Sequence, residues 1–565
     1  MARINKLTIS GYRSIKDEIE ITFPENSPVV LVGENNSGKS NIVRALDLVL
    51  GELWPGSREP EDHDFWNRDC NNGCIEIKAE MSDFTIRDNY GNEINLESFY
   101  WKCEPASEDG KPLFRAITSS GHRYVSNEMR DRCICVVIGA DRRLNYQLSY
   151  TSKNTLLSKL MRKFHNRLVS DDTRVEYLKE KFEELINIFQ GVDEFSNFQI
   201  SLKEEFSTLL KTMSYGLQVD FSAYDPSNYF RSLRVFPHEN NITRTFEELG
   251  TGQEQILALA FAHAYAKAFF GGIILVIEEP EAHLHPLAQE WLAKKIRQMA
   301  NDGLQILLTT HSPSFVDVLG IPGLVLVRKR NNTTFIKQLT AEDLTEFCLE
   351  HGALSSRTNQ QTILPFYAGS ATKEILAGLF SKMVVLVEGP TEALSLPIYF
   401  SRVELDVSKE GIAIIPVMGK GNLAKWWRFF QAYEIPTYLT FDNDNEDDQD
   451  ENKRKDALNS IEIDEDEIES IIQVEDWNVN DKFCVFGKDF ETTLRCSFQG
   501  YRQLERQAKD QIGDSKPLVA RYVAEKLQID DSVGWTKIGE LKNFLINILN
   551  PQTDVRADED DEPPF

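Results

Sequence analysis

Apolar residues fall into short runs along the first half of the chain, with the lengths typical of strands. Residues 4–9 alternate apolar and polar side chains, whereas 29–32, 272–277 and 303–310 are mostly continuous apolar runs. Alternation is typical of a strand with one buried face, and a short continuous run is typical of a strand buried on both faces. Residues 156–213 instead space their apolar side chains about 3.6 residues apart, which predicts a helical insert.

The second half of the chain repeats a pattern of apolar run and helical segment. Apolar runs lie at 383–387, 412–417 and 436–441, and helix-type sequence separates them. This strand–helix–strand order predicts a parallel sheet whose strands all end on the same edge. Open α/β sheets place their binding sites at that edge. We therefore expect an α/β protein whose functional residues follow the strand ends.

Composition and charge narrow the class of protein. The chain has 565 residues and a formal net charge of −27. Because a typical domain has about 100–200 residues, this length predicts about three domains. The negative charge argues against nonspecific adhesion to DNA, although it leaves room for a local basic groove. No apolar run approaches the roughly 20 residues of a membrane span, and the first residues lack the apolar core of a signal peptide. We expect a cytoplasmic protein without membrane contact.

A phosphate-binding motif follows the apolar run at 29–32. The sequence GENNSGKS at 33–40 matches G-x-x-x-x-G-K-S, with a strand before it and helix-type residues after it. In this motif the backbone N–H groups face phosphate oxygens, Lys39 reaches the β- and γ-phosphates, and the Ser40 hydroxyl ligates Mg²⁺. The residues expected to bind a nucleotide here are Gly33, Asn35, Asn36, Ser37, Gly38, Lys39 and Ser40.

Two carboxylates end the apolar run at 272–277. Glu278 is expected to hold Mg²⁺, directly or through water, and Glu279 is expected to polarise the attacking water as a general base. The alternative is a pair of acids that cap a surface strand. The phosphate-binding motif in the same chain favours the first interpretation, because the two features form the two halves of one nucleotide site.

Two further segments fit the same site. His311 follows the run at 303–310 and is expected to contact the γ-phosphate, and Gly250, Gly252 and Gln253 open an apolar helix whose N-terminus suits an anion. In this order, the motifs resemble those of ABC ATPases of the structural-maintenance and RecF-like kind. In that family, the signature segment of one subunit closes over ATP bound to another. The resemblance therefore implies dimerisation linked to ATP, although Gly-Thr-Gly-Gln departs from the usual Ser-Gly-Gly.

Carboxylates also follow the strands predicted in the second half. Glu388 follows the run at 383–387, and Asp442 and Asp444 follow the run at 436–441. Because Asp442 and Asp444 are two residues apart, we expect their side chains to point the same way and to bind one ion together. Oxygen-only ligands favour Mg²⁺ or Mn²⁺ over zinc. Two such metals, ~3.5–4 Å apart, can serve both the attacking and the leaving oxygen of a phosphodiester.

A second family resemblance rests on these carboxylates. Glu388 begins Glu-Gly-Pro-Thr-Glu, and with the later Asp-x-Asp it resembles the pattern of a Toprim domain; Glu392, one helical turn on, is expected to join the metal site. An ABC ATPase followed by Toprim resembles the overcoming-lysogenization-defect (OLD) family of nucleases over nearly the whole chain. That resemblance implies an ATP-responsive, Mg²⁺-dependent DNA endonuclease or nickase that uses two-metal hydrolysis in defence against phage. It also implies Glu491 as a metal ligand and Lys516 as a catalytic group that neutralises charge or moves a proton.

These resemblances divide the chain into expected domains. The ABC ATPase occupies 1–150 and 216–350, around a dimerising helical insert at 151–215, and a Rossmann-like parallel-sheet Toprim domain follows at 375–500. A helical segment with an acidic tail completes the chain at 501–565. Packing of the insert onto the ATPase core is the alternative to its use in dimerisation.

The expected cofactors are ATP and Mg²⁺ or Mn²⁺, and the expected partners are DNA and further copies of the chain in a homodimer or higher even oligomer. Related systems add a UvrD-like helicase or a retron-type reverse transcriptase with its DNA. The main alternative is a DNA-binding ATPase of the repair or chromosome-structuring type without nuclease activity, which would not need Glu388, Asp442 and Asp444. A topoisomerase or primase would need a nucleophilic-tyrosine or nucleotide-polymerising domain, and the sequence shows no sign of either.

Overall fold

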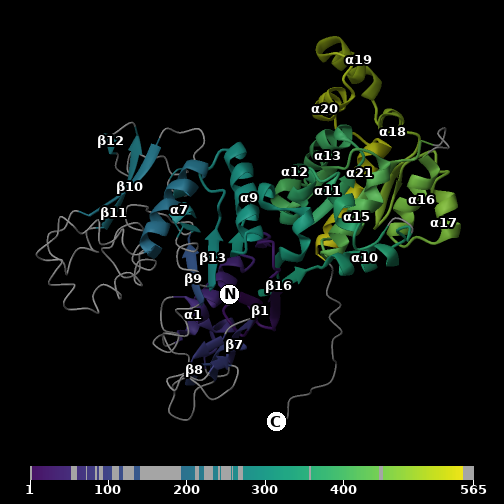
Figure 1. The fold of residues 1–565 in the computed structure, drawn as a ribbon. Helices are drawn as coiled ribbons and strands as arrows, with labels where there is room; N and C mark the ends of the chain where they lie inside the picture. Colours follow the sequence, from purple (N-terminus) through teal and green to yellow (C-terminus); the bar gives the residue numbers. More distant parts are fainter. Residues whose placement is uncertain are drawn as a thin grey trace, which may run out of the picture. The chain divides into compact units, whose positions relative to one another are not determined.

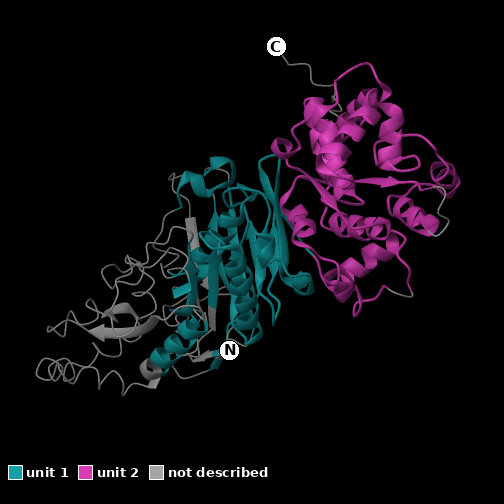
Figure 2. Ribbon diagram, turned by 90° about the horizontal axis from the view of Figure 1, so that it is seen from above, with its two compact units in different colours: residues 1–338 teal, residues 339–565 magenta. Residues whose placement is uncertain are grey.

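The computed structural model divides the chain into two compact units, residues 1–338 and 339–565, which Figure 2 shows in different colours. The helical insert expected at 151–215 is described only from residue 193 to 209 and from 215, and the acidic tail at 551–565 lies outside the described residues. The residues that the structure describes are 3–51, 60–70, 73–82, 85–87, 93–104, 113–118, 133–139, 193–209, 215–221, 233–239, 242–243, 253, 256–257, 259–261, 263–264, 272–355, 358–444 and 450–550.

The first unit contains a six-stranded sheet that carries the predicted nucleotide motifs. Its order is β16-β15-β3-β14-β13-β9, and every neighbouring pair is parallel except β15 with β16. The strand before the phosphate-binding motif, β3, is therefore central, and β14 separates it from β13. The strands are β3 (Val29–Val32), β9 (Cys133–Ile138), β13 (Gly272–Glu278), β14 (Gln305–Thr309), β15 (Leu324–Arg330) and β16 (Thr333–Gln338).

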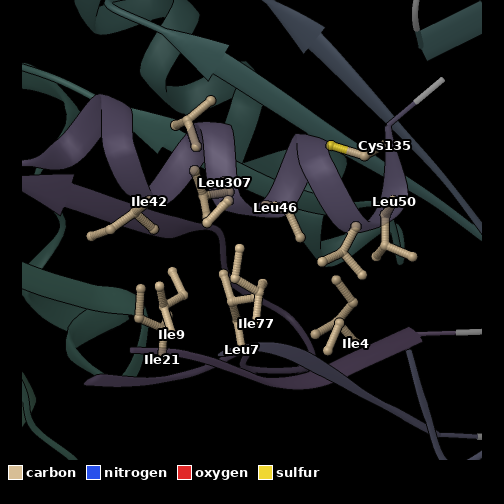
Figure 3. Close-up of a cluster of buried hydrophobic side chains, with 14 of the residues drawn as sticks. Ile4, Leu7, Ile9, Ile21, Ile42, Leu46, Leu50, Ile77, Cys135 and Leu307 are labelled. Carbon is tan, nitrogen blue, oxygen red and sulfur yellow. The ribbon is translucent and has the colours of Figure 1, made fainter. Parts of the chain in front are cut away.

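An antiparallel sheet of order β2-β1-β4-β7-β8 forms a second layer of this unit. Helix α1 (Lys39–Leu50) packs its apolar face, including Ile42 and Leu46, toward Leu7 and Ile77 of this sheet, and Figure 3 shows them facing one another. Burial of side chains from both layers removes apolar surface from water and fixes α1, which begins at the phosphate-binding loop. The strands are β1 (Arg3–Ser10), β2 (Ile19–Thr22), β4 (Ile75–Ser82), β7 (Ser98–Glu104) and β8 (Leu113–Thr118).

The remaining described elements of the first unit include helices α7 and α9 and two small sheets, of which Figure 1 labels the helices and the sheet of β10, β11 and β12. Helix α7 (Asp193–Leu209) lies inside the segment expected to be helical, and α9 (Pro286–Asn301) follows β13. One small sheet pairs β5 with β6, and the other has the order β10-β11-β12. Their strands are β5 (Thr85–Arg87), β6 (Glu93–Asn95), β10 (Tyr215–Phe221), β11 (Leu233–Glu239) and β12 (Ile242–Thr243).

The second unit is built on a five-stranded sheet of order β18-β17-β19-β21-β20. Strands β18, β17, β19 and β21 are mutually parallel, and only β20 runs antiparallel to its neighbour. The parallel sheet predicted from the three apolar runs is thus confirmed, and a fourth parallel strand, β21, joins it. The strands are β17 (Met383–Val387), β18 (Ile412–Pro416), β19 (Thr437–Asp442), β20 (Asn478–Val479) and β21 (Phe483–Phe486).

Helices connect and cover this sheet (Figure 1). Aromatic side chains such as Tyr399, Phe498 and Trp535 join the sheet to the last helices in one hydrophobic core. Short 3₁₀ turns include η10 (Lys420–Asn422). Among the described residues, no helix is both long enough and apolar enough to cross a bilayer. The helices include α10 (Ala341–Glu350), α11 (Ile363–Ala368), α13 (Pro390–Arg402), α15 (Leu423–Ala432), α16 (Glu451–Ser460), α18 (Phe490–Ser497), α19 (Tyr501–Ile512), α20 (Lys516–Lys526) and α21 (Val533–Leu549).

Candidate nucleotide and metal sites

The phosphate-binding loop joins β3 to α1 and has the conformation expected of its motif. Gly33 and Gly38 have φ angles of 142° and 113°, and Gly38 stands at the N-terminus of α1. Asn35, Asn36 and Ser40 are exposed. A loop of this kind turns its backbone N–H groups toward an anion at the start of a helix.

Lys39 and Ser37 are buried at the base of this loop. The Lys39 ammonium donates to the carbonyl oxygens of Gly33 at 3.0 Å and Glu34 at 2.8 Å. Burial lowers the pKa of Lys39 to about 8, although carboxylates led by that of Glu279 oppose the shift. The Ser37 hydroxyl is buried without a hydrogen-bond partner. A buried polar group is normally paired, so an unpaired hydroxyl beside a buried ammonium fits a loop that receives phosphate oxygens.

We expect Gly33→Ala to destabilise the first unit by at least about 2 kcal/mol. A Cβ atom at Gly33 would stand 2.0 Å from the carbonyl oxygen of Val327 on β15, and the backbone would have to move. Gly303→Ala is the matched control, since Gly303 also has a positive φ, of 96°, but a Cβ there meets nothing within 4 Å. Calorimetric melting of both variants measures the difference, and equal losses would contradict the role of the contact with Val327.

The acidic segment after β13 lies against the end of β14. The Glu279 N–H donates to the carbonyl oxygen of Thr309 at 2.9 Å, and its carboxylate lies 3.8 Å from the imidazole of His311. Burial and the Lys39 cation lower the pKa of His311. The structure therefore brings Lys39, Glu279 and His311 within electrostatic reach of one another. Glu278 is the last residue of β13, as the sequence predicted.

Glu281 holds this arrangement together, and the sequence analysis did not single it out. Its carboxylate accepts hydrogen bonds from the His311 backbone N–H at 2.5 Å and from the Thr310 hydroxyl at 2.9 Å. Glu281 thereby ties the turn after β13 to the turn after β14. Its position in the sequence Glu-Glu-Pro-Glu, beside the two predicted carboxylates, could have indicated a role for Glu281 in the site. Gly250 and Gly252 lie outside the described residues, and Gln253 lies in a helical segment.

The carboxylates of the second unit meet at the carboxyl ends of two neighbouring strands. Glu388 follows β17, and Asp442 is the last residue of β19, which pairs in parallel with β17. The Glu388 carboxylate accepts a hydrogen bond of 2.7 Å from the Asp442 backbone N–H. One carboxylate oxygen of Asp442, Oδ1, is buried without a hydrogen-bond partner. The predicted neighbourhood of Glu388 and Asp442 is therefore present, with an oxygen ready to accept a positive charge.

Asp444 also belongs to this cluster, but its backbone does not continue strand β19 as the sequence predicted. Strand β19 ends at Asp442, and Asp444 has a φ of 43°, so the alternation of side chains along a strand does not extend to it. Asn443 causes the turn: it is fully buried, and its side-chain amide donates at 2.9 Å to the carbonyl oxygens of Ile471 and Val474. Prediction from strand geometry was wrong here because a buried amide, invisible in the local pattern, bends the chain.

Lys420 is the central cation of this cluster, and the sequence analysis assigned it no role. Its ammonium forms an ion pair with Asp444 and lies 3.7 Å from the Glu388 carboxylate, and its side chain is only 3% exposed. Arg454 donates to the carbonyl oxygens of Asn443 and Asp444. The Gly-Lys-Gly sequence directly after a predicted strand was the signal that could have indicated Lys420.

Glu392, Glu491 and Lys516 form a neighbouring group. Glu392 lies in the first turn of α13 and accepts a hydrogen bond of 3.1 Å from the Gly389 N–H. Glu491 lies in the first turn of α18, and Lys516 is the first residue of α20. Burial raises the pKa of Glu392 to about 7, with Glu491 adding to the rise and Lys516 opposing it. The structure thus places these three predicted residues where their charges act on one another.

The electrostatics of the cluster favour an added cation. Burial raises the pKa of Glu388 to about 7 and that of Asp442 well above its ordinary value, and neighbouring carboxylates add to both shifts. Carboxylates with raised pKa values release their protons when a divalent ion binds. Within the described residues, no group of three or more His, Cys, Asp or Glu side chains is arranged so that it could hold a metal ion without rearrangement. Lys420, paired with Asp444, supplies part of the positive charge instead.

Two family models match the parts of the chain that carry these two groups of residues. The family described as AAA ATPase domain matches residues 3–113 and 102–316, and the family described as overcoming lysogenization defect protein-like, TOPRIM domain, matches residues 379–444. The OLD nuclease of Thermus scotoductus is 26% identical over 78% of this chain and 82% of its own length. The Old nuclease of Escherichia phage P2 is 22% identical over 78% of this chain and 77% of its own.

A third relative, the endonuclease GajA of Bacillus cereus, is 23% identical over 39% of this chain and 35% of its own length. The two family matches fall on separate parts of the chain, in the order in which the phosphate-binding loop and the carboxylate cluster occur. The chain therefore belongs to the AAA ATPase domain family, carries an overcoming lysogenization defect protein-like TOPRIM domain after the ATPase domain, and is similar to OLD nucleases over most of its length.

Proposed function

We propose that this protein is an ATP-binding, Mg²⁺-dependent DNA endonuclease or nickase. The observation that carries the proposal is the unpaired, buried oxygen of Asp442 beside Glu388, two carboxylates at neighbouring strand ends. Such carboxylates cost free energy in the absence of a cation, because burial disfavours their charged forms. A divalent metal offsets this cost. The raised pKa values of Glu388 and Asp442 support a metal site over a structural one.

The residues proposed to hold the metal are Glu388, Asp442 and Asp444, and Glu392 and Glu491 are proposed for a second ion. Bound Mg²⁺ or Mn²⁺ would supply a nucleophilic water and stabilise the charge of the leaving oxygen in phosphodiester hydrolysis. Glu388 accepts the Asp442 N–H and is thereby oriented toward the shared position. The carboxylate-only set favours Mg²⁺ or Mn²⁺ over zinc.

Two lysines are proposed to balance negative charge at the site, either that of the reacting phosphate or that of the carboxylates. Lys516 acts on both Glu392 and Glu491 electrostatically, so it lies where it would neutralise charge or move a proton. Lys420 is proposed to hold Asp444 and Glu388 in place until the metal enters. Both lysines would favour approach of the negative DNA backbone in a chain whose net charge is −27.

The first unit is proposed to bind and hydrolyse ATP. Lys39 and the loop N–H groups would hold the phosphates, and Ser40 and Glu278 would hold Mg²⁺. Glu279 would orient the attacking water, and His311 would contact the γ-phosphate. The distance of 3.8 Å between Glu279 and His311 supports this division of roles. ATP is proposed to act through a homodimer or higher even oligomer whose signature segment includes Gly250, Gly252 and Gln253.

The proposed biological setting is defence against phage or foreign DNA, as the family resemblance implies. A UvrD-like helicase, or a retron reverse transcriptase with its DNA, remains the proposed class of partner. The similarity to the endonuclease GajA supports a nuclease, and the Septu protein PtuA of Bacillus mycoides is a further relative, 24% identical over 55% of this chain and 38% of its own length. Infection of cells that carry the parent or the Asp442→Ala/Asp444→Ala gene tests this setting, and equal phage yields would contradict it.

Plasmid cleavage tests the proposed activity. The parent and the Asp442→Ala/Asp444→Ala variant are incubated with supercoiled plasmid and Mg²⁺ or Mn²⁺, with and without ATP, and with a chelator. We expect nicking or cutting by the parent only, and none with the chelator. The ATP lanes give the sign of regulation. Equal cleavage by parent and variant would reject the site, and cleavage by neither would favour a DNA-binding ATPase without nuclease activity.

A further inference from the structure

A pocket in the second unit adjoins the carboxylate cluster and has no role in the proposed hydrolysis. Its volume is about 710 Å³, within the roughly 300–1,000 Å³ typical of small-molecule and cofactor sites. Residues of α10, α11, η10, α15 and α16 line it, among them Cys348, Phe366, Tyr367, Gly421, Lys425 and Arg428. All of these elements belong to one compact unit.

Two elements, η10 and α16, contribute residues both to the lining of the pocket and to the carboxylate cluster. In η10, Lys420 contacts Asp444 and Glu388, while the next residue, Gly421, lines the pocket. In α16, Arg454 donates to the Asn443 and Asp444 carbonyl oxygens, while its neighbours on both sides line the pocket. A ligand in the pocket would therefore contact the same two elements, η10 and α16, that hold Asp444 of the proposed metal site.

Basic side chains outnumber acidic ones in the lining of the pocket. Four basic residues and one acidic residue line it: Lys425, Arg428, Lys453, Lys455 and Asp456. The chain as a whole carries a formal charge of −27. Arg428 is paired with Asp456 at 2.6 Å, and Lys453 and Lys455 are paired with carboxylates of their own helix or of the next one. Within the described part of the unit, no carboxylate forms an ion pair with Lys425. An ammonium that no carboxylate neutralises favours an anionic ligand.

In the pocket, the ammonium of Lys425 lies beside the aromatic ring of Phe366. The Lys425 ammonium donates to the Phe366 carbonyl oxygen at 2.5 Å and to the Ser370 hydroxyl at 2.6 Å, and it lies 3.8 Å from the centre of the Phe366 ring. An ammonium has three N–H donors, so one remains for a ligand. Phe366 is 57% exposed, which leaves ring surface open for stacking. Lys425 itself is only 6% exposed, as expected of a group held in place.

We propose that this pocket binds one nucleotide unit, with its base stacked on Phe366 and its phosphate accepting the third N–H of Lys425. Aromatic stacking combined with a cation is the general way in which proteins hold single nucleotides without reading their sequence. The unit comes either from a DNA strand that enters the neighbouring metal site or from a free mononucleotide. The DNA source rests on the proposed nuclease function, whereas the free nucleotide does not.

Binding measurements on the full chain test this site. The Lys39→Ala background removes phosphate binding by the first unit, and a chelator prevents cleavage. The two probes are a short fluorescein-labelled single-stranded oligodeoxyadenylate, followed by anisotropy, and dAMP, followed by calorimetry. We expect Phe366→Ala to raise the Kd of at least one probe by about tenfold. We expect Lys425→Met to reduce the salt dependence of oligonucleotide binding by about 0.7 in log–log slope.

Matched controls separate the pocket from general surface effects. Ile529→Ala removes an apolar side chain that is 61% exposed and does not line the pocket, and Lys409→Ala removes an exposed lysine elsewhere in the unit. Both should leave the Kd values unchanged. An effect of Phe366→Ala on the oligonucleotide alone assigns the pocket to DNA, and an effect on dAMP alone assigns it to a free nucleotide.

The outcomes that overturn the proposal are distinct from those that overturn the nuclease function. The pocket is rejected if the parent binds neither probe, or if Phe366→Ala and Ile529→Ala bind both probes equally. Because Phe366 is exposed, its variant decides the question even if Lys425→Met does not fold. A parent that binds the probes but leaves plasmid intact under all metal conditions rejects the nuclease function and retains the pocket.

Discussion

Asp442→Asn should abolish plasmid cleavage and at the same time stabilise the metal-free second unit at alkaline pH. The loss of rate is expected to be at least about 10³-fold, because a carboxylate that holds the metal contributes several kcal/mol to the transition state. The gain in stability has a separate cause. Asp442 is half-buried, its Oδ1 atom is buried without a hydrogen-bond partner, and burial together with the Glu388 carboxylate raises its pKa.

The sign of the stability change follows from proton linkage. A carboxyl whose pKa is raised in the folded state contributes its full stability when protonated, and this contribution is lost as pH rises through the folded pKa. The neighbouring Glu388 has a pKa raised from 4.5 to about 7, so the metal-free parent should lose stability as the pH rises from about 4.5 to about 7. Asp442→Asn removes one of the charges, and we expect a gain of about 1–2 kcal/mol at pH 8 and little change at about pH 4.

Calorimetric melting in a chelator, at both pH values, measures this change alongside the cleavage assay. Asp510→Asn is the matched control, since Asp510 is exposed on α19 and its side chain forms no ion pair or hydrogen bond with the described residues. It should alter neither cleavage nor melting. Loss of cleavage accompanied by loss of stability at pH 8 would indicate that Asp442 is a structural residue rather than a metal ligand.

Lys39→Ala should weaken ATP binding by about 100-fold and remove ATP hydrolysis. The Lys39 ammonium is held at the base of the loop by the carbonyl oxygens of Gly33 and Glu34, so it is already positioned where phosphates arrive. Charge-assisted hydrogen bonds to phosphate are stronger than neutral ones, and no other buried lysine of the described first unit lies in this loop. Lys294→Ala, an exposed lysine on α9, is the control and should behave as the parent.

The pH dependence of ATP binding gives a second, independent readout of Lys39. Its pKa is lowered to about 8 in the nucleotide-free protein, and a bound phosphate would raise it again. At pH 8 we therefore expect ATP binding to take up about half a proton, and affinity to fall as the pH rises further. Calorimetry in buffers of different ionisation enthalpy measures the uptake. A Lys39→Ala variant that takes up the same number of protons would show that another group is responsible.

Local sequence determined those parts of the molecule that depend on neighbouring residues. The glycines and Lys39 of the phosphate-binding loop follow a strand and begin a helix as predicted, because a loop of this kind is specified by a few consecutive residues. The apolar runs before Glu388 and Asp442 predicted parallel strands, and parallel strands bring their ends together whatever connects them. The proximity of Glu388 and Asp442 therefore followed from pattern alone.

Which other side chains lie beside the ends of these strands is known only from the tertiary structure. Asp444 turns away from strand geometry because the buried amide of Asn443 binds carbonyl oxygens about thirty residues later in the chain. Lys420, which follows strand β18, forms an ion pair with Asp444, which follows strand β19. Glu281 connects the turn after β13 to the turn after β14 by two hydrogen bonds. Such contacts arise from long-range packing and from the need to pair buried polar groups, and no local period of apolar residues encodes them.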